Sequence, residues 1–572
     1  MLHAKNTQVL LALALALVGY AIIALPPYFV FLATTGVLIA IMVRSLGVLT
    51  DQAGLLSLCH MTFAGIGAWA VGWLGIHAPQ LPYLLMLALG GVAGLVAGVL
   101  IGLPALRLRG LNLAAITLTF AVAADAVFST IGFPGNEAMI AFQRPGLFAD
   151  ERNFLALCVV LFIVITVVLR RVSQARTGAM WEAISYSERA TAAMGVSVAR
   201  AKLTAFSASA GLAGLCGGLM MSQLGVLTAS NFSPLSSLSL FALTIFVGGR
   251  YWEGTLIAGL LFVGVPELLR RFGLPLDLEA VIFAVGAIDA LRKKSSLAGG
   301  IRLALKARQR RKSGEQDHEV TERETEEICE TSSKRFVQDS DSTLEISNLL
   351  VHYGNVVAVD NLSITVEPGT IMGLVGPNGA GKSTIIDAVT GFLPDAGGIV
   401  RLGDTDLHGS VPHHRAELGV RRTFQQGRSI PELTVGQYLR LSAGHDIPDE
   451  DIDAILTYME CPTADTLISD IEIGLRRVVE IAANLAARPQ VLLLDEPAAG
   501  LSADQSEKLG QHIARIPELF GCSVLLVEHD MDLVRTVCDQ ITVVDFGKVI
   551  AQGTPDQVLN QSNVLEAYLG AA

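Results

Sequence analysis

Long apolar runs fill the first half of the chain and restrict its fold more than any other feature. A helix needs about 20 apolar residues to cross a bilayer, because lipid offers no partners for backbone polar groups. About ten runs qualify, although several are short or rich in glycine, and one or two could be re-entrant. They cover residues 8–25, 28–43, 54–75, 82–103, 111–132, 154–169, 201–223, 236–249, 254–269 and 277–291. These runs predict a polytopic α-helical membrane domain over residues 1–292.

The first run could be read as a signal peptide, but its flanking sequence favours a membrane span. Pro26, Pro27 and a further apolar run follow it, without a convincing small-residue cleavage site. We therefore expect a retained first span.

Charge separates the apolar half from the rest of the chain. The first 300 residues carry 18 of the 41 Lys and Arg and 12 of the 53 Asp and Glu, so the remainder is strongly acidic. Residues 293–342 lack apolar periodicity and change from a basic to an acidic stretch, a composition too polar to fold alone. We expect a solvated, flexible linker there, with contact between its basic stretch and anionic lipid as the alternative. Residues 343–572 then form a separate domain.

Basic residues between the runs predict an orientation in the membrane. If every run crosses, most Lys and Arg fall on one side, which the positive-inside rule makes the cytoplasmic side. Arg144, Arg152, Arg270 and Arg271 are the exceptions. Both termini and the last domain are then expected in the cytoplasm.

Four ionisable side chains fall within the apolar runs, where such groups are functional candidates. Glu267 and Asp289 lie near the ends of their runs, so we expect them at the membrane interface. His60 and Asp125 are better candidates for a translocation path, and bonds to neighbouring helices are the alternative.

The longest cytoplasmic loop of this topology, residues 170–201, has a helical pattern of its own. Residues 178–202 are amphipathic, with Gly195 as a stop signal. The apolar positions are Met180, Ala183, Ile184, Ala190, Ala193 and Met194. Either the segment is a surface helix between two spans, or it docks in a groove of the last domain.

A phosphate-binding loop opens the chemistry of the last domain. The segment Gly376-Pro377-Asn378-Gly379-Ala380-Gly381-Lys382-Ser383-Thr384 matches GxxxxGK[ST] completely. It follows an apolar strand, residues 370–375, and opens an apolar helix, residues 384–389, which is the context this motif requires. Its glycines allow backbone N–H groups to face a β-phosphate, while Lys382 neutralises β- and γ-oxygens and Ser383 binds Mg²⁺. ATP and Mg²⁺ are thus the expected cofactors.

Two later strands supply the remaining polar groups of an ATP-hydrolysing site. Four apolar residues, 491–494, end in Asp495 and Glu496. A buried strand would bring Asp495 to Mg²⁺ and place Glu496 to polarise the attacking water. His529 follows another apolar strand, residues 523–527, and would reach the γ-phosphate, although a lone histidine there is more often structural.

These motifs, in this order, resemble the ATPase of an ABC transporter over residues 344–572. The resemblance implies an α/β P-loop NTPase that couples ATP hydrolysis to solute translocation. It further implies that Gln425, in RRTFQQ, is the Q-loop glutamine near the catalytic groups and Mg²⁺, with Gln426 as the alternative. Tyr353, in VHYGN, matches the aromatic residue that stacks on adenine, and residues 498–502 match the D-loop.

One family motif departs from its usual form. The segment Ile471-Glu472-Ile473-Gly474-Leu475 stands where the family has LSGGQ, so Glu472 occupies the serine position. In the family this segment caps the nucleotide bound to a second ATPase, and a carboxylate there should repel the γ-phosphate. We expect an asymmetric pair of sites, or else a variant loop geometry.

The membrane half resembles the permeases of branched-chain amino-acid ABC importers. The similar segments are residues 54–70, 105–121, 177–214 and 246–261. The ATPase resembles that system's own ATPases through RRTFQ, PELTV, DEPAAGLS and the closing QVLNQSNVLEAYLG. The chain thus reads as a permease fused to an ATP-binding subunit.

The resemblance implies ATP-driven import of a small hydrophobic amino acid or related solute across the cytoplasmic (inner) membrane. An extracytoplasmic binding protein would select the solute, which leaves its identity open. The implied partners are the lipid bilayer and a second permease and ATPase, or a second copy of this chain, with no nucleic acid. The alternatives are an ABC exporter half-transporter and a regulatory subunit with a degenerate signature site.

Overall fold

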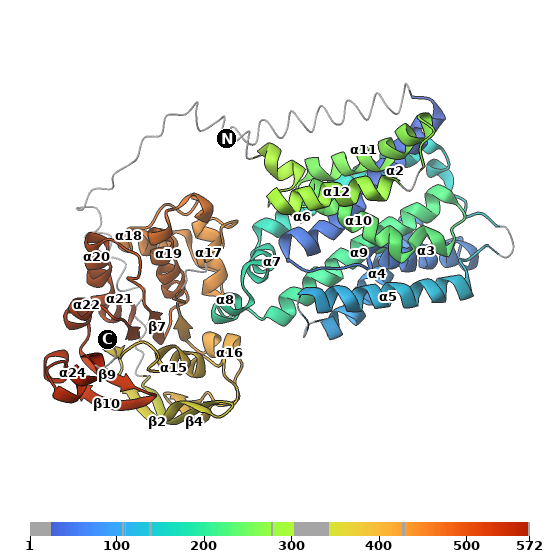
Figure 1. The fold of residues 1–572 in the computed structure, drawn as a ribbon. Helices are drawn as coiled ribbons and strands as arrows, with labels where there is room; N and C mark the ends of the chain where they lie inside the picture. The colour runs from blue at the N-terminus through green and yellow to red at the C-terminus, as the bar shows by residue number, and fades with distance from the viewer. Residues whose placement is uncertain are drawn as a thin grey trace, which may run out of the picture. The chain divides into compact units, whose positions relative to one another are not determined.

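The computed structural model describes residues 25–105, 108, 110–136, 140–275, 278–293, 295–302, 342–425 and 429–569. They belong to two compact units, which are described in turn (Figure 1). The first consists of Met1–Trp181 and Ala199–Gln316, and the second of Glu182–Val198 and Asp317–Ala572. The short segment Glu182–Val198 is therefore part of the unit that contains the phosphate-binding loop, although apolar runs flank the segment in the sequence.

The first unit is built of helices that follow the apolar runs. They are α2 (Pro27–Gly47), α3 (His60–His77), α4 (Tyr83–Ala105), α5 (Gly110–Ile131), α6 (Glu151–Gln174), α9 (Val198–Leu224), α10 (Pro234–Val247), α11 (Trp252–Arg271) and α12 (Leu278–Lys293). Pro27 and Pro234 open α2 and α10, where the missing N–H of proline costs nothing. A π-helical turn, η1 (Val48–Gln52), follows α2.

Each of the nine predicted runs that fall within the described residues coincides with one helix. The run 8–25 lies outside them except for Leu25. Within the described part of the chain, seven helical stretches are long and apolar enough to span a membrane. They are Pro27–Gln52, Tyr83–Pro104, Gly110–Ile131, Glu151–Gln174, Val198–Leu224, Ala229–Val247 and Trp252–Arg271. Helices α3 and α12 are not among the seven, so the expected number of about ten spans is not confirmed.

Small residues allow the helices of this unit to pack backbone against backbone. A Cβ atom on Gly67 of α3 would lie 2.0 Å from the carbonyl oxygen of Gly214 on α9. A Cβ atom on Gly259 of α11 would lie 2.1 Å from the carbonyl oxygen of Gly36 on α2. Such approaches are the usual role of small residues between membrane helices.

The ionisable side chains of the runs have different surroundings. His60 is buried, and its Nε2 lies 3.0 Å from Ser45 Oγ, which donates to the carbonyl of Ser209. Asp125 is partly exposed on α5. Glu267 accepts hydrogen bonds from Arg270 and Arg271 at 2.8 and 3.1 Å.

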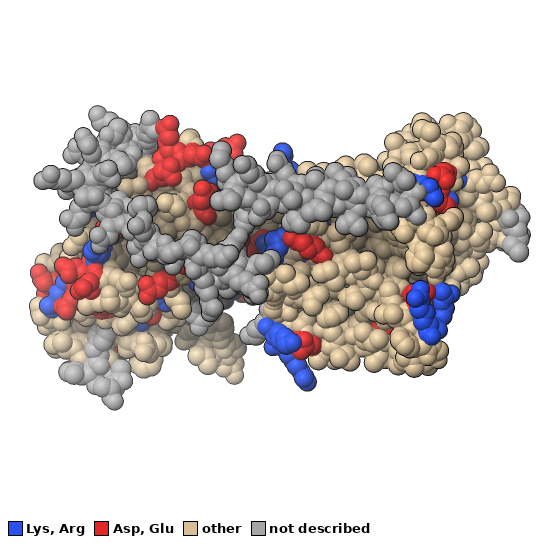
Figure 2. Space-filling view, turned by 90° about the horizontal axis from the view of Figure 1, so that it is seen from above, with Lys and Arg blue, Asp and Glu red and all other residues tan. Residues whose placement is uncertain are grey.

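Most basic residues that break the predicted orientation are neutralised locally. Arg270 and Arg271 share the carboxylate of Glu267, and Arg144 pairs with Glu151. On the face shown in Figure 2, the described charged side chains of the helical unit gather towards its two ends and leave a broad uncharged surface between them. This distribution suits a unit whose middle faces lipid.

The second unit is an α/β domain with two sheets. A parallel arrangement of β9 (Gln540–Asp545), β3 (Ile371–Val375), β8 (Ser523–Val527), β7 (Val491–Asp495) and β6 (Val420–Arg422) forms the larger sheet, with β10 (Lys548–Gly553) antiparallel at its edge. Strands β3, β7 and β8 are buried at every position, as central parallel strands are. The carboxyl ends of β3, β6, β7 and β8 therefore meet at one edge.

A smaller antiparallel sheet packs beside the larger one. Its order is β2 (Val356–Val366), β1 (Leu344–Tyr353), β4 (Gly397–Leu402) and β5 (Thr405–Asp406). Apolar side chains from both sheets and from α15 (Lys382–Val389) form one core cluster.

Further helices cover the larger sheet. They are α16 (Pro412–Glu417), α17 (Val435–Ala443), α18 (Asp449–Tyr458), α19 (Ile473–Leu485), α20 (Ala503–Ala514), α21 (Ile516–Phe520), α22 (Met531–Val537), α23 (Pro555–Val558) and α24 (Ser562–Leu569).

The predicted amphipathic segment 178–202 forms two short helices before α9 begins. They are α7 (Arg176–Tyr186) and α8 (Glu188–Ala193), and the hydroxyl of Ser187 caps α8 by accepting from the N–H of Ala190. Gly195 adopts φ +74° after α8, as the stop signal predicts. Five of the six predicted apolar positions are buried: Ala183, Ile184, Ala190, Ala193 and Met194. Helix α8 packs on α16 of the ATPase, so the docking alternative is the one observed.

Candidate nucleotide-binding and hydrolysis site

The phosphate-binding loop connects β3 to α15, and its glycines are required by the backbone. Gly376, Gly379 and Gly381 have φ values of +155°, +85° and +100°. A Cβ atom on Gly376 would lie 2.1 Å from the Val544 carbonyl oxygen, and one on Gly381 would lie 2.7 Å from that of Ala358. The loop therefore curls into a narrow cradle that side chains would close.

Lys382 lies inside this cradle. Its ammonium donates to the carbonyl oxygens of Gly376 at 2.6 Å and Pro377 at 3.0 Å. Burial lowers the pKa of Lys382, while Asp495 and Glu496 act in the opposite direction. Ser383 and Asn378 are exposed at the mouth of the loop. A cation with two loop carbonyls as its partners fits a site that receives phosphate oxygens.

Asp495 ends β7 as a buried carboxylate beside a buried arginine. Its Oδ2 lies 3.4 Å from Nη2 of Arg422, and both side chains are about 5% exposed or less. Burial raises the pKa of Asp495, and Arg422 opposes that shift. The N–H of Asp495 donates to the hydroxyl of Thr423 at 3.3 Å.

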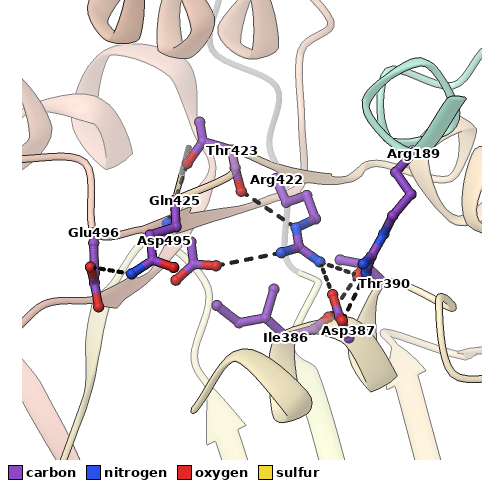
Figure 3. A network of polar contacts seen from close by, with 9 residues as sticks. All are labelled: Arg189, Ile386, Asp387, Thr390, Arg422, Thr423, Gln425, Asp495 and Glu496. Carbon is purple, nitrogen blue, oxygen red and sulfur yellow. Dashed lines mark hydrogen bonds and ion pairs between the residues drawn. The ribbon is translucent and has the colours of Figure 1, made fainter. Parts of the chain in front are cut away.

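Glu496 follows in a left-handed conformation, with φ +49°. Its Oε2 accepts a 2.7 Å hydrogen bond from the amide of Gln425, which lies just after β6 (Figure 3). Arg477 on α19 donates to the backbone carbonyls of both residues, at 3.1 Å for Glu496 and 2.8 Å for Gln425. Two predicted catalytic side chains are thus in direct contact. Gln426, the alternative Q-loop residue, lies outside the described residues.

His529 follows β8 and is largely exposed, with its Nδ1 3.6 Å from Oε2 of Glu528. Glu528 is buried and accepts from the N–H groups of Ala498 and His529 at 2.9 and 3.1 Å. Burial raises the pKa of Glu528, and these two backbone donors oppose the shift. Glu528 thereby ties the segment after Glu496 to the segment that carries His529.

Tyr353 is half-exposed at the end of β1 and pairs with Val356 of β2. The carbonyl of Ala358, two residues further along β2, lies against Gly381. The ring therefore stands at the end of the hairpin that adjoins the phosphate-binding loop. Val356 and Val357 add exposed apolar surface next to it.

Four side chains that sequence reasoning did not single out hold the predicted ones in place. Arg422 and Thr423 support Asp495, Arg477 supports Glu496, and Glu528 supports His529. A weak signal existed for one of them. Glu528 directly follows the apolar strand β8, at the sheet edge where polar groups of such folds gather.

Two residues, Glu472 and Ile473, are exposed in the segment that stands where the family has its signature. Glu472 precedes α19 as its N-cap residue, without a side-chain capping bond, and Ile473 is 76% exposed. A Cβ atom on Gly474 would lie 2.8 Å from Leu501 of the D-loop.

The residues present fit a nucleotide and Mg²⁺. The loop backbone requires glycine at Gly376 and Gly381, Lys382 supplies a cation, and Asp495 supplies a buried carboxylate. Within the described residues, no group of three or more His, Cys, Asp or Glu side chains could hold a metal ion. The expected ligand set of Ser383, Gln425 and Asp495 has one carboxylate, which is typical of Mg²⁺ that shares its shell with phosphates.

Comparisons with known proteins assign each unit to a component of one system. The family model "Branched-chain amino acid transport system / permease component" matches residues 28–287. The family model "ABC transporter" matches residues 359–499, and "Branched-chain amino acid ATP-binding cassette transporter" matches residues 548–572. The second unit is therefore an ATP-hydrolysing, nucleotide-binding domain, and the first makes the chain a multi-pass membrane protein with a cytoplasmic ATPase.

Individual relatives cover the ATPase part of the chain. The high-affinity branched-chain amino acid transport ATP-binding protein LivG of Escherichia coli (strain K12) is 35% identical over 254 residues, covering 41% of this chain and 100% of that protein. BraF of Pseudomonas aeruginosa, described in the same words, is 34% identical over 250 residues, covering 40% and 98%. A crystal structure of an ATP-binding cassette in its ADP conformation is 27% identical, covers 40% of this chain and 99% of its own, and has a TM-score of 0.37.

The permease match and the ATPase relatives thus meet in one polypeptide. The chain belongs to the branched-chain amino-acid ABC transporter family and joins a permease component to an ATP-binding component.

Proposed function

We propose that this chain imports a small hydrophobic amino acid or a related solute across the cytoplasmic membrane, driven by ATP hydrolysis. The observation that carries the proposal is the presence, in one chain, of a branched-chain permease match and an ABC ATPase match that includes Lys382, Asp495 and Glu496. The relatives whose names include branched-chain amino acid transport support the same solute class. The proposed domain boundaries are 1–292, 293–342 and 343–572, with both termini in the cytoplasm.

The proposed site divides the chemistry among named side chains. Gly376 to Thr384 bind the phosphates, and Tyr353 stacks on the adenine. Ser383, Gln425 and Asp495 hold Mg²⁺, which neutralises charge on the transferring phosphoryl group when bound. Glu496 accepts a proton from the attacking water, and Gln425 orients Glu496 through their 2.7 Å hydrogen bond. His529 donates to the γ-phosphate from the end of β8.

The proposed assembly contains more than this chain. A permease of this kind needs a second permease, and an ATPase of this kind needs a second cassette whose signature covers its nucleotide. A homodimer would place Glu472 at both sites, whereas a heteromeric partner with an ordinary signature would give one strong site and one weak one. We therefore favour a heteromer, which receives its solute from an extracytoplasmic binding protein.

The test is uptake by vesicles that contain the assembled transporter. The full chain, its partner subunits and a candidate binding protein are reconstituted into proteoliposomes, with labelled leucine on both faces and ATP on one. ATP on the face that carries the ATPase should drive leucine towards that face. Loss of leucine from that face instead would assign an exporter, and ATP hydrolysis without any movement of solute would assign the regulatory alternative.

The same assay tests whether ATP hydrolysis by this chain drives the uptake. Glu496→Gln should abolish uptake while nucleotide binding remains, because the substitution removes the proton acceptor and preserves the side-chain shape. Uptake at the wild-type rate in this variant would contradict the proposal that Glu496 takes part in the ATP hydrolysis that drives transport.

A further inference from the structure

Helix α8 of the second unit carries an arginine that binds α15, the helix that follows the phosphate-binding loop. Nη2 of Arg189 lies 2.8 Å from Oδ2 of Asp387 on α15 (Figure 3). The Arg189 guanidinium also lies over the ring of Phe392, 4.7 Å from its centroid. The contact is charge-assisted and anchored by a ring, so it is more specific than an ordinary surface ion pair.

Asp387 has a second arginine partner. Its other oxygen, Oδ1, accepts a 2.6 Å bond from Nη1 of Arg422, which also donates to the hydroxyl of Thr390 at 3.2 Å. Arg422 lies over the rings of Phe424 at 4.4 Å and Phe392 at 5.7 Å. One carboxylate thus holds two guanidinium groups, one oxygen for each.

Arg422 continues the chain of contacts to the proposed metal ligand. Its second amino group, Nη2, lies 3.4 Å from Oδ2 of Asp495, and its side chain is 4% exposed. The four side chains, Arg189, Asp387, Arg422 and Asp495, come from α8, α15, β6 and β7. We call them the ionic relay.

We propose that Asp387 is a positioning residue through which α8 sets the alignment of Asp495 for Mg²⁺. With Arg189 in place, the charge of Asp387 is shared between two cations, and Arg422 remains free to hold Oδ2 of Asp495. Without Arg189, Asp387 draws Arg422 more strongly, and the longer Arg422–Asp495 contact is the one that gives way. Partners that orient a metal ligand in this way commonly change metal affinity by about 10- to 100-fold when removed.

The position of α8 in the chain connects the ionic relay to a candidate membrane span. Helix α8 is joined covalently to α7 and α9, and α9 is one of the seven candidate membrane spans. A shift of these helices therefore reaches Asp387 through Arg189. The role given to Asp387 rests on the proposed Mg²⁺-binding role of Asp495 and not on the solute or the direction of transport.

The test measures metal affinity in the assembled transporter with full-length chain. Mn²⁺ serves as the probe, and its binding in the presence of a non-hydrolysable ATP analogue is followed by electron paramagnetic resonance. The Mg²⁺ concentration that half-saturates ATP hydrolysis is measured in parallel. Arg189→Gln should weaken Mn²⁺ binding and raise the half-saturating Mg²⁺ concentration by about three- to ten-fold, less than direct removal of a ligand partner. The rate at saturating Mg²⁺ should stay within about two-fold.

Matched variants separate positioning from general damage. Arg189→Lys keeps the charge and should restore most of the affinity, whereas Arg200→Gln, on α9 and outside the ionic relay, should leave it unchanged. Asp387→Asn should weaken Mn²⁺ binding as well, and adding Arg189→Gln to it should weaken binding no further, because both act through one contact.

Unchanged Mn²⁺ affinity in Arg189→Gln, or strictly additive losses in the double variant, would refute the proposed positioning role of Asp387. Arg189 is 44% exposed, so its variants should fold even where Asp387→Asn does not. A wild-type complex that hydrolyses ATP yet takes up no amino acid would refute the proposed function while leaving this test intact.

Discussion

Two sides of this ATPase differ in how firmly their side chains are held. The Walker side carries Lys382, Asp495 and Glu496, and the signature side carries residues 471–475. On the Walker side, Lys382, Asp495 and Glu496 each have defined polar partners at 2.6 to 3.4 Å. On the signature side, Glu472 is exposed and its side chain does not cap the helix it precedes. The first side holds its polar groups through contacts within the chain, whereas in the proposed assembly a partner subunit would cover the second.

The difference teaches where variation is tolerated. A buried charge without its partner costs several kcal/mol, so removal of the buried Arg422 alone would leave Asp495 uncompensated. Glu472 is exposed and makes no side-chain capping bond, so it is free of that constraint. A carboxylate at position 472 is therefore compatible with the fold.

The largest effect is expected from removal of the proton acceptor on the Walker side. Glu496→Gln should lower the ATP hydrolysis rate of the assembled transporter by about 10²- to 10⁴-fold, the usual contribution of a positioned general base. Nucleotide affinity, measured with a fluorescent ATP analogue, should change little. Glu507→Gln, on the exposed face of α20, is the matched control and should hydrolyse ATP at the wild-type rate. A Glu496→Gln transporter of normal activity would mean that another group takes the proton.

A smaller effect tests whether the cradle is preformed. Gly381→Ala adds a Cβ atom 2.7 Å from the Ala358 carbonyl oxygen at φ +100°, so it should weaken ATP binding by about 10- to 100-fold. Gly379→Ala is the matched control, since its φ is also positive but nothing lies within 4 Å. It should lose clearly less affinity in the same fluorescence titration. Equal losses would show that backbone strain, and not the Ala358 contact, shapes the loop.

The signature side should respond in the opposite direction. Glu472→Ser restores a hydroxyl donor and removes a negative charge, so ATP hydrolysis by the assembled transporter should rise. One charge near the γ-phosphate at a partly screened surface is worth about 1.4 kcal/mol, or roughly ten-fold in rate. Glu472→Gln separates the two causes, because it removes the charge without adding the hydroxyl. If neither variant changes hydrolysis, the two nucleotide sites are not made unequal by Glu472.

The smallest effect concerns the rim of the Walker side. Tyr353→Ala should raise the KM for ATP by about five-fold and leave kcat unchanged, because one aromatic stacking contact is worth about 1 kcal/mol. Tyr353→Phe keeps the ring and should behave like the wild type in a steady-state ATPase assay. A fall in kcat for Tyr353→Ala would instead connect the hairpin end to the chemical step.

Local sequence was a good guide to the central strands of the ATPase. Strand β8 has the predicted bounds, β7 ends one residue after the predicted apolar run 491–494, and β3 begins one residue later than the predicted strand. Buried parallel strands appear as uninterrupted apolar runs, and a polar residue directly after such a run marks the edge where ligands bind. The contact between Gln425 and Glu496 agrees with the expectation that Gln425 lies near the catalytic groups, while the roles of both residues stay predictions.

Hydropathy was a poorer guide to the start of α3. The run 54–75 is apolar throughout, yet residues 54–59 are irregular and the helix begins at His60. The N–H of Leu58 donates to the hydroxyl of Thr117, and the N–H of Met61 donates to that of Ser237. Side chains from distant helices thus satisfy backbone groups that a helix would otherwise have to satisfy itself. A hydropathy scale does not contain that information.

The sequence by itself determined the chemistry of this protein: a phosphate-binding loop, a pair of carboxylates and a set of spans depend on residues adjacent in the chain. Tertiary structure decided which side chains hold that chemistry in place. Residues 189, 387 and 422 are far from one another and from Asp495 in sequence, and each of these three reads alone as an ordinary charge. They contact one another because the sheet order places β6 beside β7 and the docked α8 brings Arg189 to Asp387 on α15. Ion pairs depend on distance in space, which the order of residues does not reveal.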